Sequence, residues 1–147
     1  MESIWQRTVK LPVFEPLCGD KNTDVLIIGG GITGLLTAYF LKQDGVDCCV
    51  VEKGRICQGT TGHTTAKITA QHGLIYHKIV KAAGLEIAQK YLRANQKALE
   101  EYRHLCRQLD CDFEDKDNFV YTLGNQKILH KEMDALEAID AIETVEE

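Results

Sequence analysis

Residues 24–34 read DVLIIGGGITG, and this segment decides the fold class of the chain. Its apolar, largely β-branched run, Val25–Ile28, is typical of a strand that is buried on both faces. Glycines follow at once, although glycine loses more conformational freedom on folding than any other residue. Apolar residues at helical spacing then occupy Ile32–Gln43, and Gly45 follows as a stop signal. The segment therefore predicts a strand, a tight glycine turn and a helix.

A second apolar strand is predicted at residues 47–51, DCCVV. Strand, helix and strand within about 28 residues form the βαβ unit of parallel sheets. Residues 1–22 are expected to be an irregular lead-in, and residues 54–73 a loop with at most a short helix or strand. The remaining predictions are helices at 74–83, 85–109 and 126–142 and a strand at 119–123. The pattern as a whole predicts an α/β fold with added helices.

The glycines have the spacing Gly29-x-Gly31-x-x-Gly34 after a predicted strand and at the start of a predicted helix. In that context each has a physical reason: Gly29 for the sharp turn, Gly31 for close approach of a pyrophosphate, and Gly34 for close packing of helix and strand. The free N–H groups at the start of the helix favour an anion there. The spacing therefore predicts a Rossmann-type dinucleotide site.

Glu52 follows the second predicted strand, 18 residues after Gly34 and 23 after Gly29. These separations bracket the distance of about 20 residues expected for the acid that binds an adenosine ribose. A carboxylate there would repel a 2′-phosphate, so FAD or NAD is expected rather than NADP. The alternative interpretation is a plain glycine turn beside a solvated acid, and the residues alone do not choose between FAD and NAD.

Taken together, residues 24–54 resemble the N-terminal fingerprint of the D-amino acid oxidase-like family of FAD-dependent oxidoreductases. Residues 59–69, GTTGHTTAKIT, are similar to the family's second FAD-contacting loop. The resemblance covers about residues 3–123 and implies FAD as the cofactor and a Rossmann-type FAD/NAD(P)-binding domain. It is closest to a bacterial subgroup of glycine/D-amino acid oxidases, some of whose members end in a Rieske iron–sulfur domain.

The resemblance and the glycine spacing together give a set of expected cofactor-binding residues. This set contains Gly29, Gly30, Gly31, Ile32, Thr33, Gly34, Glu52, Lys53, Gly59, Thr60, Thr61 and His63. In dimethylglycine-dehydrogenase-like members, a histidine in a G-T-T-x-H-T pattern is bonded covalently to the flavin, and His63 has that place here. The interpretation we favour for His63 is a loop histidine near the cofactor. No catalytic residue is identified.

The expected activity is hydride transfer from a C–N bond of an amine or amino acid to flavin. We expect residues 1–23 to be the lead-in and residues 24–147 to be the N-terminal part of an FAD-binding domain that is incomplete relative to the family. Open strand edges would then favour self-association or a partner chain that completes the fold. The alternatives are an NAD- or ADP-binding module without redox chemistry of its own and an inactive truncated fragment.

Composition excludes several other classes. The formal net charge of −5 gives no reason to expect nucleic-acid binding. No apolar run approaches the roughly 20 residues that a membrane helix needs. The first residues lack the features of a signal peptide, so a cytoplasmic location is expected. Six cysteines form no C-x-x-C pair, and no metal site is expected.

Overall fold

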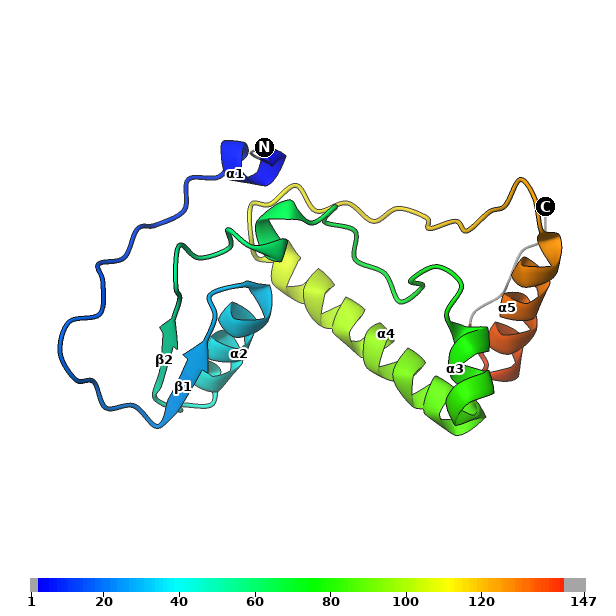
Figure 1. Ribbon diagram of the computed structural model, residues 1–147, viewed down its shortest axis with the longest axis horizontal. Coiled ribbons are helices and arrows are strands. Elements are labelled where there is room, and N and C mark those ends of the chain that lie inside the picture. Colours follow the sequence, from blue (N-terminus) through cyan, green and yellow to red (C-terminus); the bar gives the residue numbers. More distant parts are fainter. Residues whose placement is uncertain (1–2, 142–147) are drawn as a thin grey trace. The chain divides into compact units, whose positions relative to one another are not determined.

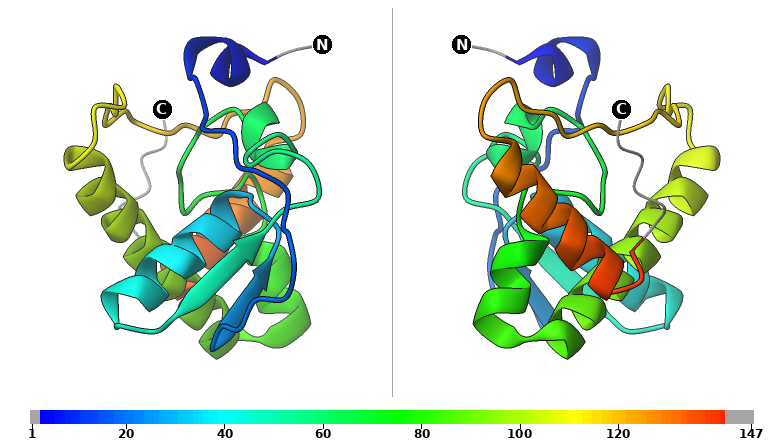
Figure 2. Two further views of the ribbon diagram at one scale, coloured as in Figure 1. Left: turned by 90° about the vertical axis from the view of Figure 1, so that its left-hand side faces the viewer. Right: turned by 90° about the vertical axis from the view of Figure 1, so that its right-hand side faces the viewer.

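The computed structural model describes residues 3–141 of the chain. The chain divides into two compact units, Met1–Lys67 and Ile68–Glu147. Figure 1 labels the α-helices and strands of both, and Figure 2 gives two further views. Among the described residues, no helix is both long enough and apolar enough to cross a membrane.

A parallel β-α-β unit forms the centre of the Met1–Lys67 unit. Strand β1 (Val25–Ile28) is followed by helix α2 (Ile32–Gln43) and strand β2 (Cys48–Val51). The strands pair in parallel from Val25 opposite Cys48 to Ile28 opposite Val51. The predicted strand, helix and strand are therefore confirmed, and β2 begins one residue later than predicted. A two-stranded parallel sheet with mixed helices is consistent with part of a Rossmann-like domain.

Only one face of β1 is covered. Val25 and Ile27 are half-buried, whereas Leu26 and Ile28 are exposed, Ile28 by 83%. The prediction that β1 is buried on both faces is therefore wrong for this structure. The cause is that α2 is the helix packed on this two-stranded sheet, and one helix covers one face.

Two short helices lie on either side of the β-α-β unit in the sequence. Helix α1 (Ile4–Thr8) begins with a capping box, in which Ser3 and Gln6 exchange side chain to backbone hydrogen bonds. This helix lies in the segment that was expected to be irregular. The 3₁₀ helix η1 (Thr60–His63) agrees with the prediction of a loop holding at most a short helix.

Within residues 68–141, the described part of the second unit, the regular structure consists of three helices: α3 (Tyr76–Ala83), α4 (Leu85–Arg107) and α5 (Gln126–Ala138). Gly84 joins α3 to α4 with a φ of +86°, a left-handed conformation that favours glycine. Helix α3 packs against both α4 and α5. Among the described residues, the buried apolar cluster of this unit contains Ala70, Tyr76, Ala88, Leu92, Ala135, Ile139 and Ala141.

The strand predicted at residues 119–123 is wrong. This segment has no regular structure, and Phe119, Tyr121 and Leu123 are exposed, Leu123 by 98%. Alternating apolar residues favour an extended backbone, but a strand also needs a neighbouring strand to accept its hydrogen bonds. The helix predicted at 126–142 ends at Ala138, and residue 142 lies outside the described residues.

A buried carboxylate on α5 caps the start of α3. Glu132 is 2% exposed. Its Oε1 accepts hydrogen bonds from the backbone N–H groups of Ile75 and Tyr76, at 2.9 and 2.8 Å. Its Oε2 accepts from the backbone N–H of His77 at 2.9 Å and contacts His77 Nδ1 at 2.6 Å. Since Ile75 has no side-chain cap of its own, Glu132 supplies the acceptor that the first turn of α3 needs.

We expect Glu132→Ala to lower the free energy of unfolding of this unit by about 3 kcal/mol, because it leaves His77 and buried N–H groups without their acceptor. Burial raises the pKa of Glu132, but hydrogen bonds from the backbone and side chain of His77 outweigh it and hold the pKa below the ordinary value of 4.5. A lowered folded-state pKa contributes stability above the unfolded-state pKa, and this is lost as the pH falls through the folded-state value.

Urea unfolding followed by helix circular dichroism at pH 7 and at acid pH tests this expectation. The matched control is Asp134→Ala, which removes an exposed acid from the same helix and should change stability little. Equal stability of the two variants at pH 7 would show that Glu132 is not the cap.

Candidate cofactor site

The glycine turn begins where β1 ends. Gly29 has a φ of +110°, which few residues other than glycine adopt, and its N–H donates to the carbonyl of Val51 at 2.8 Å. This hydrogen bond therefore connects the start of the turn to the last residue of β2. This agrees with the role predicted for Gly29 as the residue that allows a sharp turn.

Gly34 lies where α2 approaches the turn most closely. A Cβ atom at this position would be 2.0 Å from the Gly29 carbonyl oxygen and 3.2 Å from Cγ2 of Ile27. The first contact is with backbone, which cannot rotate away as a side chain can. The first turn of α2 can therefore come this close to β1 only without a side chain at position 34.

Gly30 is buried under the loop that follows β2. A Cβ atom there would be 2.8 Å from Cγ2 of Ile56 and 3.2 Å from the Cβ of Glu52. The carbonyl of Gly30 accepts a hydrogen bond from the N–H of Cys57 at 2.9 Å. Ile56 and Cys57 were not among the predicted site residues, and their packing on a glycine gives no recognisable signal in one sequence.

Glu52 holds the turn with its carboxylate. Its Oε2 accepts from the N–H of Gly30 at 2.8 Å, and its Oε1 accepts from the N–H of Gly54 at 2.9 Å. The hydrogen bonds from Gly54 and then Gly30 lower the pKa of Glu52. The exposed group is therefore an anion at neutral pH. Because a carboxylate has about four acceptor positions, it can accept further hydroxyl groups.

Thr61 connects η1 with the first turn of α2. Its Oγ1 accepts a hydrogen bond from the N–H of Ile32 at 2.9 Å. Gly31 is the N-cap residue of α2, and a Cβ there would be 3.2 Å from the same Oγ1. The predicted loop and the predicted glycine turn are therefore brought together in one unit.

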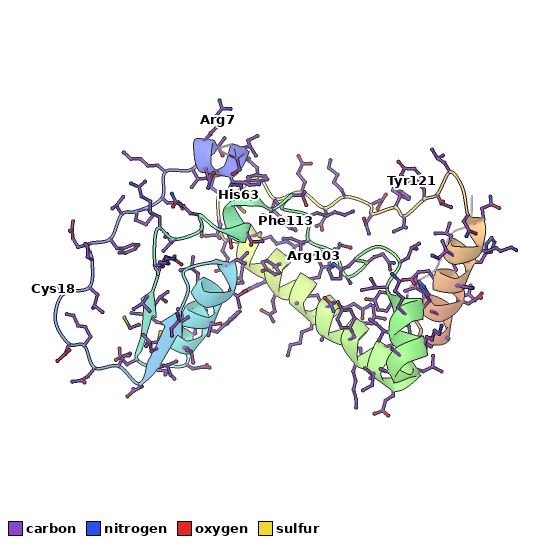
Figure 3. All side chains as sticks on the ribbon, in the orientation of Figure 1. Arg7, Cys18, His63, Arg103, Phe113 and Tyr121 are labelled. Carbon is purple, nitrogen blue, oxygen red and sulfur yellow. The ribbon has the colours of Figure 1, made fainter. Side chains whose placement is uncertain are left out.

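The other predicted residues lie around this centre. Thr33 is exposed in the first turn of α2, and Lys53 is exposed after Glu52. Gly59 is the N-cap of η1, and Thr60 is its first residue. His63, labelled in Figure 3, lies at the end of η1, and its Nδ1 is 2.9 Å from the Gly59 carbonyl oxygen. Since a carbonyl oxygen only accepts, Nδ1 carries the proton.

Residues 24–146 match the model of a family described as FAD dependent oxidoreductase. The chain belongs to this family. The match includes β1, the glycine turn, Glu52 and the loop at 59–64. It confirms the resemblance drawn from the sequence, and membership implies FAD as the cofactor.

Curated proteins similar to the chain include bacterial and yeast proteins. The chain is 39% identical over 138 residues to "Putative Rieske 2Fe-2S iron-sulfur protein YhfW" of Bacillus subtilis, covering 91% of this chain and 27% of that protein. It is 29% identical over 113 residues to gamma-glutamylputrescine oxidoreductase of Escherichia coli, covering 76% and 26%. It is 37% identical over 93 residues to mitochondrial glycerol-3-phosphate dehydrogenase of Saccharomyces cerevisiae, covering 63% and 14%.

The chain spans about a quarter of the length of the first two of these relatives. No solved structure matches the chain. The similarity to the Bacillus subtilis protein extends over 91% of this chain.

The geometry of this unit fits the adenosine diphosphate part of FAD. Gly31 presents backbone without a side chain at the start of α2, where N–H groups and the helix dipole favour a phosphate. The Glu52 carboxylate accepts a hydrogen bond from the N–H of Gly30 and still has acceptor positions for ribose hydroxyls. A neutral backbone site beside a fixed anion suits a diphosphate linked to a sugar.

Proposed function

We propose that residues 29–34 and Glu52 bind the pyrophosphate and adenosine ribose of FAD, and that Gly59, Thr60, Thr61 and His63 lie nearer the flavin. Lys53 is included because it follows Glu52 in the same loop. We further propose that the protein oxidises a C–N bond of an amine or amino acid. The name of the Escherichia coli relative, an oxidoreductase of gamma-glutamylputrescine, supports an amine substrate.

One observation carries the cofactor proposal: the Glu52 carboxylate is 2.8 Å from the N–H of Gly30. This contact supports the proposal, because the carboxylate expected to bind the ribose lies beside the glycine turn expected to bind the pyrophosphate. A solvated acid unrelated to the turn would not need to be held there. The two halves of the sequence fingerprint therefore meet in space.

The flavin, when bound, would supply the redox chemistry by accepting a hydride from the carbon next to nitrogen. The residues of this chain would bind and orient the cofactor. The backbone of the glycine turn would hold the phosphates, and the Glu52 anion would accept hydrogen bonds from the ribose. The Nδ1 of His63 is hydrogen-bonded to the Gly59 carbonyl oxygen, and the covalent attachment of this ring to flavin stays a hypothesis.

Titration of the chain with FAD, followed by visible absorbance and flavin fluorescence, tests the proposal. We expect saturable binding by the wild type, and roughly tenfold or weaker binding by Glu52→Gln, because hydrogen bonds to a charged acceptor contribute more than neutral ones. Asp47→Asn is the matched control, since it removes an acid that precedes β2 rather than follows it. Its affinity should equal that of the wild type.

Two results would contradict this assignment. If the wild type binds no FAD, the cofactor proposal fails, and the interpretation as an inactive fragment gains support. If Glu52→Gln binds FAD as tightly as the wild type does, the ribose is held elsewhere. Competition by NAD at similar concentration would favour the alternative of a module for NAD or ADP-like ligands.

A further inference from the structure

Helix α1 is attached to the loop that the proposed function places near the flavin. The hydroxyl of Ser3 donates a hydrogen bond to the carbonyl of Gly62. The indole Nε1–H of Trp5 donates to the carbonyl of Thr64 at 2.7 Å. These two carbonyls belong to the last turn of η1 and to the residue that caps it. Ser3 and Trp5 therefore hold the backbone at the end of η1 at two points, Gly62 and Thr64.

The capping box makes this attachment stiff. Ser3 Oγ accepts from the N–H of Gln6 at 3.3 Å, while Gln6 Oε1 accepts from the N–H of Ser3 at 3.0 Å. The Ser3 hydroxyl thus accepts within α1 and donates to Gly62. Because the hydroxyl group donates one hydrogen bond and accepts another, it has one favoured orientation.

Gly62 fits this contact because it has no side chain. A Cβ at Gly62 would be 2.4 Å from the carbonyl oxygen of Cys57 and 3.2 Å from Nε2 of Gln6. The residue is buried between α1 and the loop that follows β2. The close approach of α1 to η1 is therefore built into the backbone.

The opposite attachment of η1 is to the start of α2, where Thr61 Oγ1 accepts from the N–H of Ile32 at 2.9 Å. Thr61 directly precedes Gly62, so α1 and α2 hold neighbouring residues of one short helix. In Figure 3, α1, which carries Arg7, lies next to η1, which carries His63. A movement of α1 would shift the Thr61 hydroxyl relative to the glycine turn.

We propose that α1 is a clamp that positions η1 for FAD, with Ser3 and Trp5 as positioning residues that do not touch the cofactor. This inference rests on the proposed function and goes beyond it, because both residues lie outside the family match at residues 24–146 and outside the predicted cofactor set. The clamp orders η1 before FAD binds, so that less conformational entropy is lost on binding.

The test compares Ser3→Ala and Trp5→Phe with Ile4→Ala, an exposed position on the same helix. Amide hydrogen exchange of the peptide covering residues 57–66, in protein without cofactor, measures the clamp directly. Each of the two variants loses one hydrogen bond to the backbone of residues 62–64, which should speed this exchange roughly fivefold and weaken FAD binding by a similar factor. Ile4→Ala should change neither, and Ser3→Thr, which keeps the hydroxyl, should restore both.

Trp5→Phe keeps a six-membered aromatic ring and removes the five-membered ring that carries the N–H donor, and it leaves the capping box intact, so it remains informative if Ser3→Ala unfolds. Unchanged exchange in both variants would overturn the clamp, whatever the FAD affinity. Faster exchange with unchanged FAD affinity would overturn its role in cofactor binding. If the wild type binds no FAD but both variants exchange faster than the wild type, the proposed function is refuted. The attachment of α1 to η1 is then established independently of FAD.

Discussion

Replacing Gly34 by alanine is expected to unfold the Met1–Lys67 unit. The added methyl group would lie 2.0 Å from the carbonyl oxygen of Gly29, far inside van der Waals contact. Relief requires α2 to move away from β1, which breaks the contacts that hold the small β-α-β unit together. Insertion of one methyl group into a tight contact costs about 1–3 kcal/mol, and a backbone partner puts the cost at the upper end or above.

Trp5 is the single tryptophan of the chain and lies in this unit, so its fluorescence during urea unfolding measures the loss. The matched control is Gly54→Ala, where the nearest atom to a new Cβ is Oε1 of Glu52 at 3.9 Å, an ordinary contact. We expect Gly54→Ala to be as stable as the wild type. If Gly34→Ala were equally stable, the close approach of α2 to the glycine turn would be wrong.

The β-α-β unit could be predicted from the sequence because each of its features has a local cause. Apolar β-branched residues form β1, helical spacing forms α2, and Gly29 is needed where φ is +110°. The position of Glu52 at the end of β2 follows from the same strand pattern. Its contact with Gly30 could not be predicted, because a hydrogen bond between residues 22 apart depends on the folded turn.

Features that depend on contacts distant in sequence were missed. Helix α1 is five residues long, and its hydrogen bonds to Gly62 and Thr64 join positions 59 residues apart. In the sequence, Glu132 is one of several acids on an amphipathic helix. Its role as a cap becomes evident only from the packing of α3 against α5. The strand predicted at 119–123 fails for the opposite reason, since its local pattern is right for a strand and no neighbouring strand pairs with it in the described part of the chain.

Replacing Gly31 by valine is expected to abolish FAD binding while the protein without cofactor stays folded. A Cβ at this position would be 3.2 Å from Oγ1 of Thr61, which is a side-chain atom that can move. The folded unit can therefore accept valine with a small shift and the loss of the hydrogen bond from Ile32 to Thr61. The pyrophosphate of FAD could not avoid the valine, because the branched side chain would lie between it and the start of α2.

We expect FAD affinity to fall at least about 100-fold, equivalent to ~2.7 kcal/mol, with the free energy of unfolding changed by less than about 1 kcal/mol. Equilibrium titration by flavin fluorescence and urea unfolding measure the two quantities on the same sample. The matched control is Ile32→Val, which puts the same side chain one residue later and leaves the backbone at Gly31 without a side chain. Its affinity should stay within about twofold of wild type, because the backbone rather than the side chain is the proposed contact.

A Gly31→Val protein that retains wild-type affinity would place the pyrophosphate away from the glycine turn. Equal losses of affinity in both variants would show that side-chain packing, and not access to the backbone, controls binding.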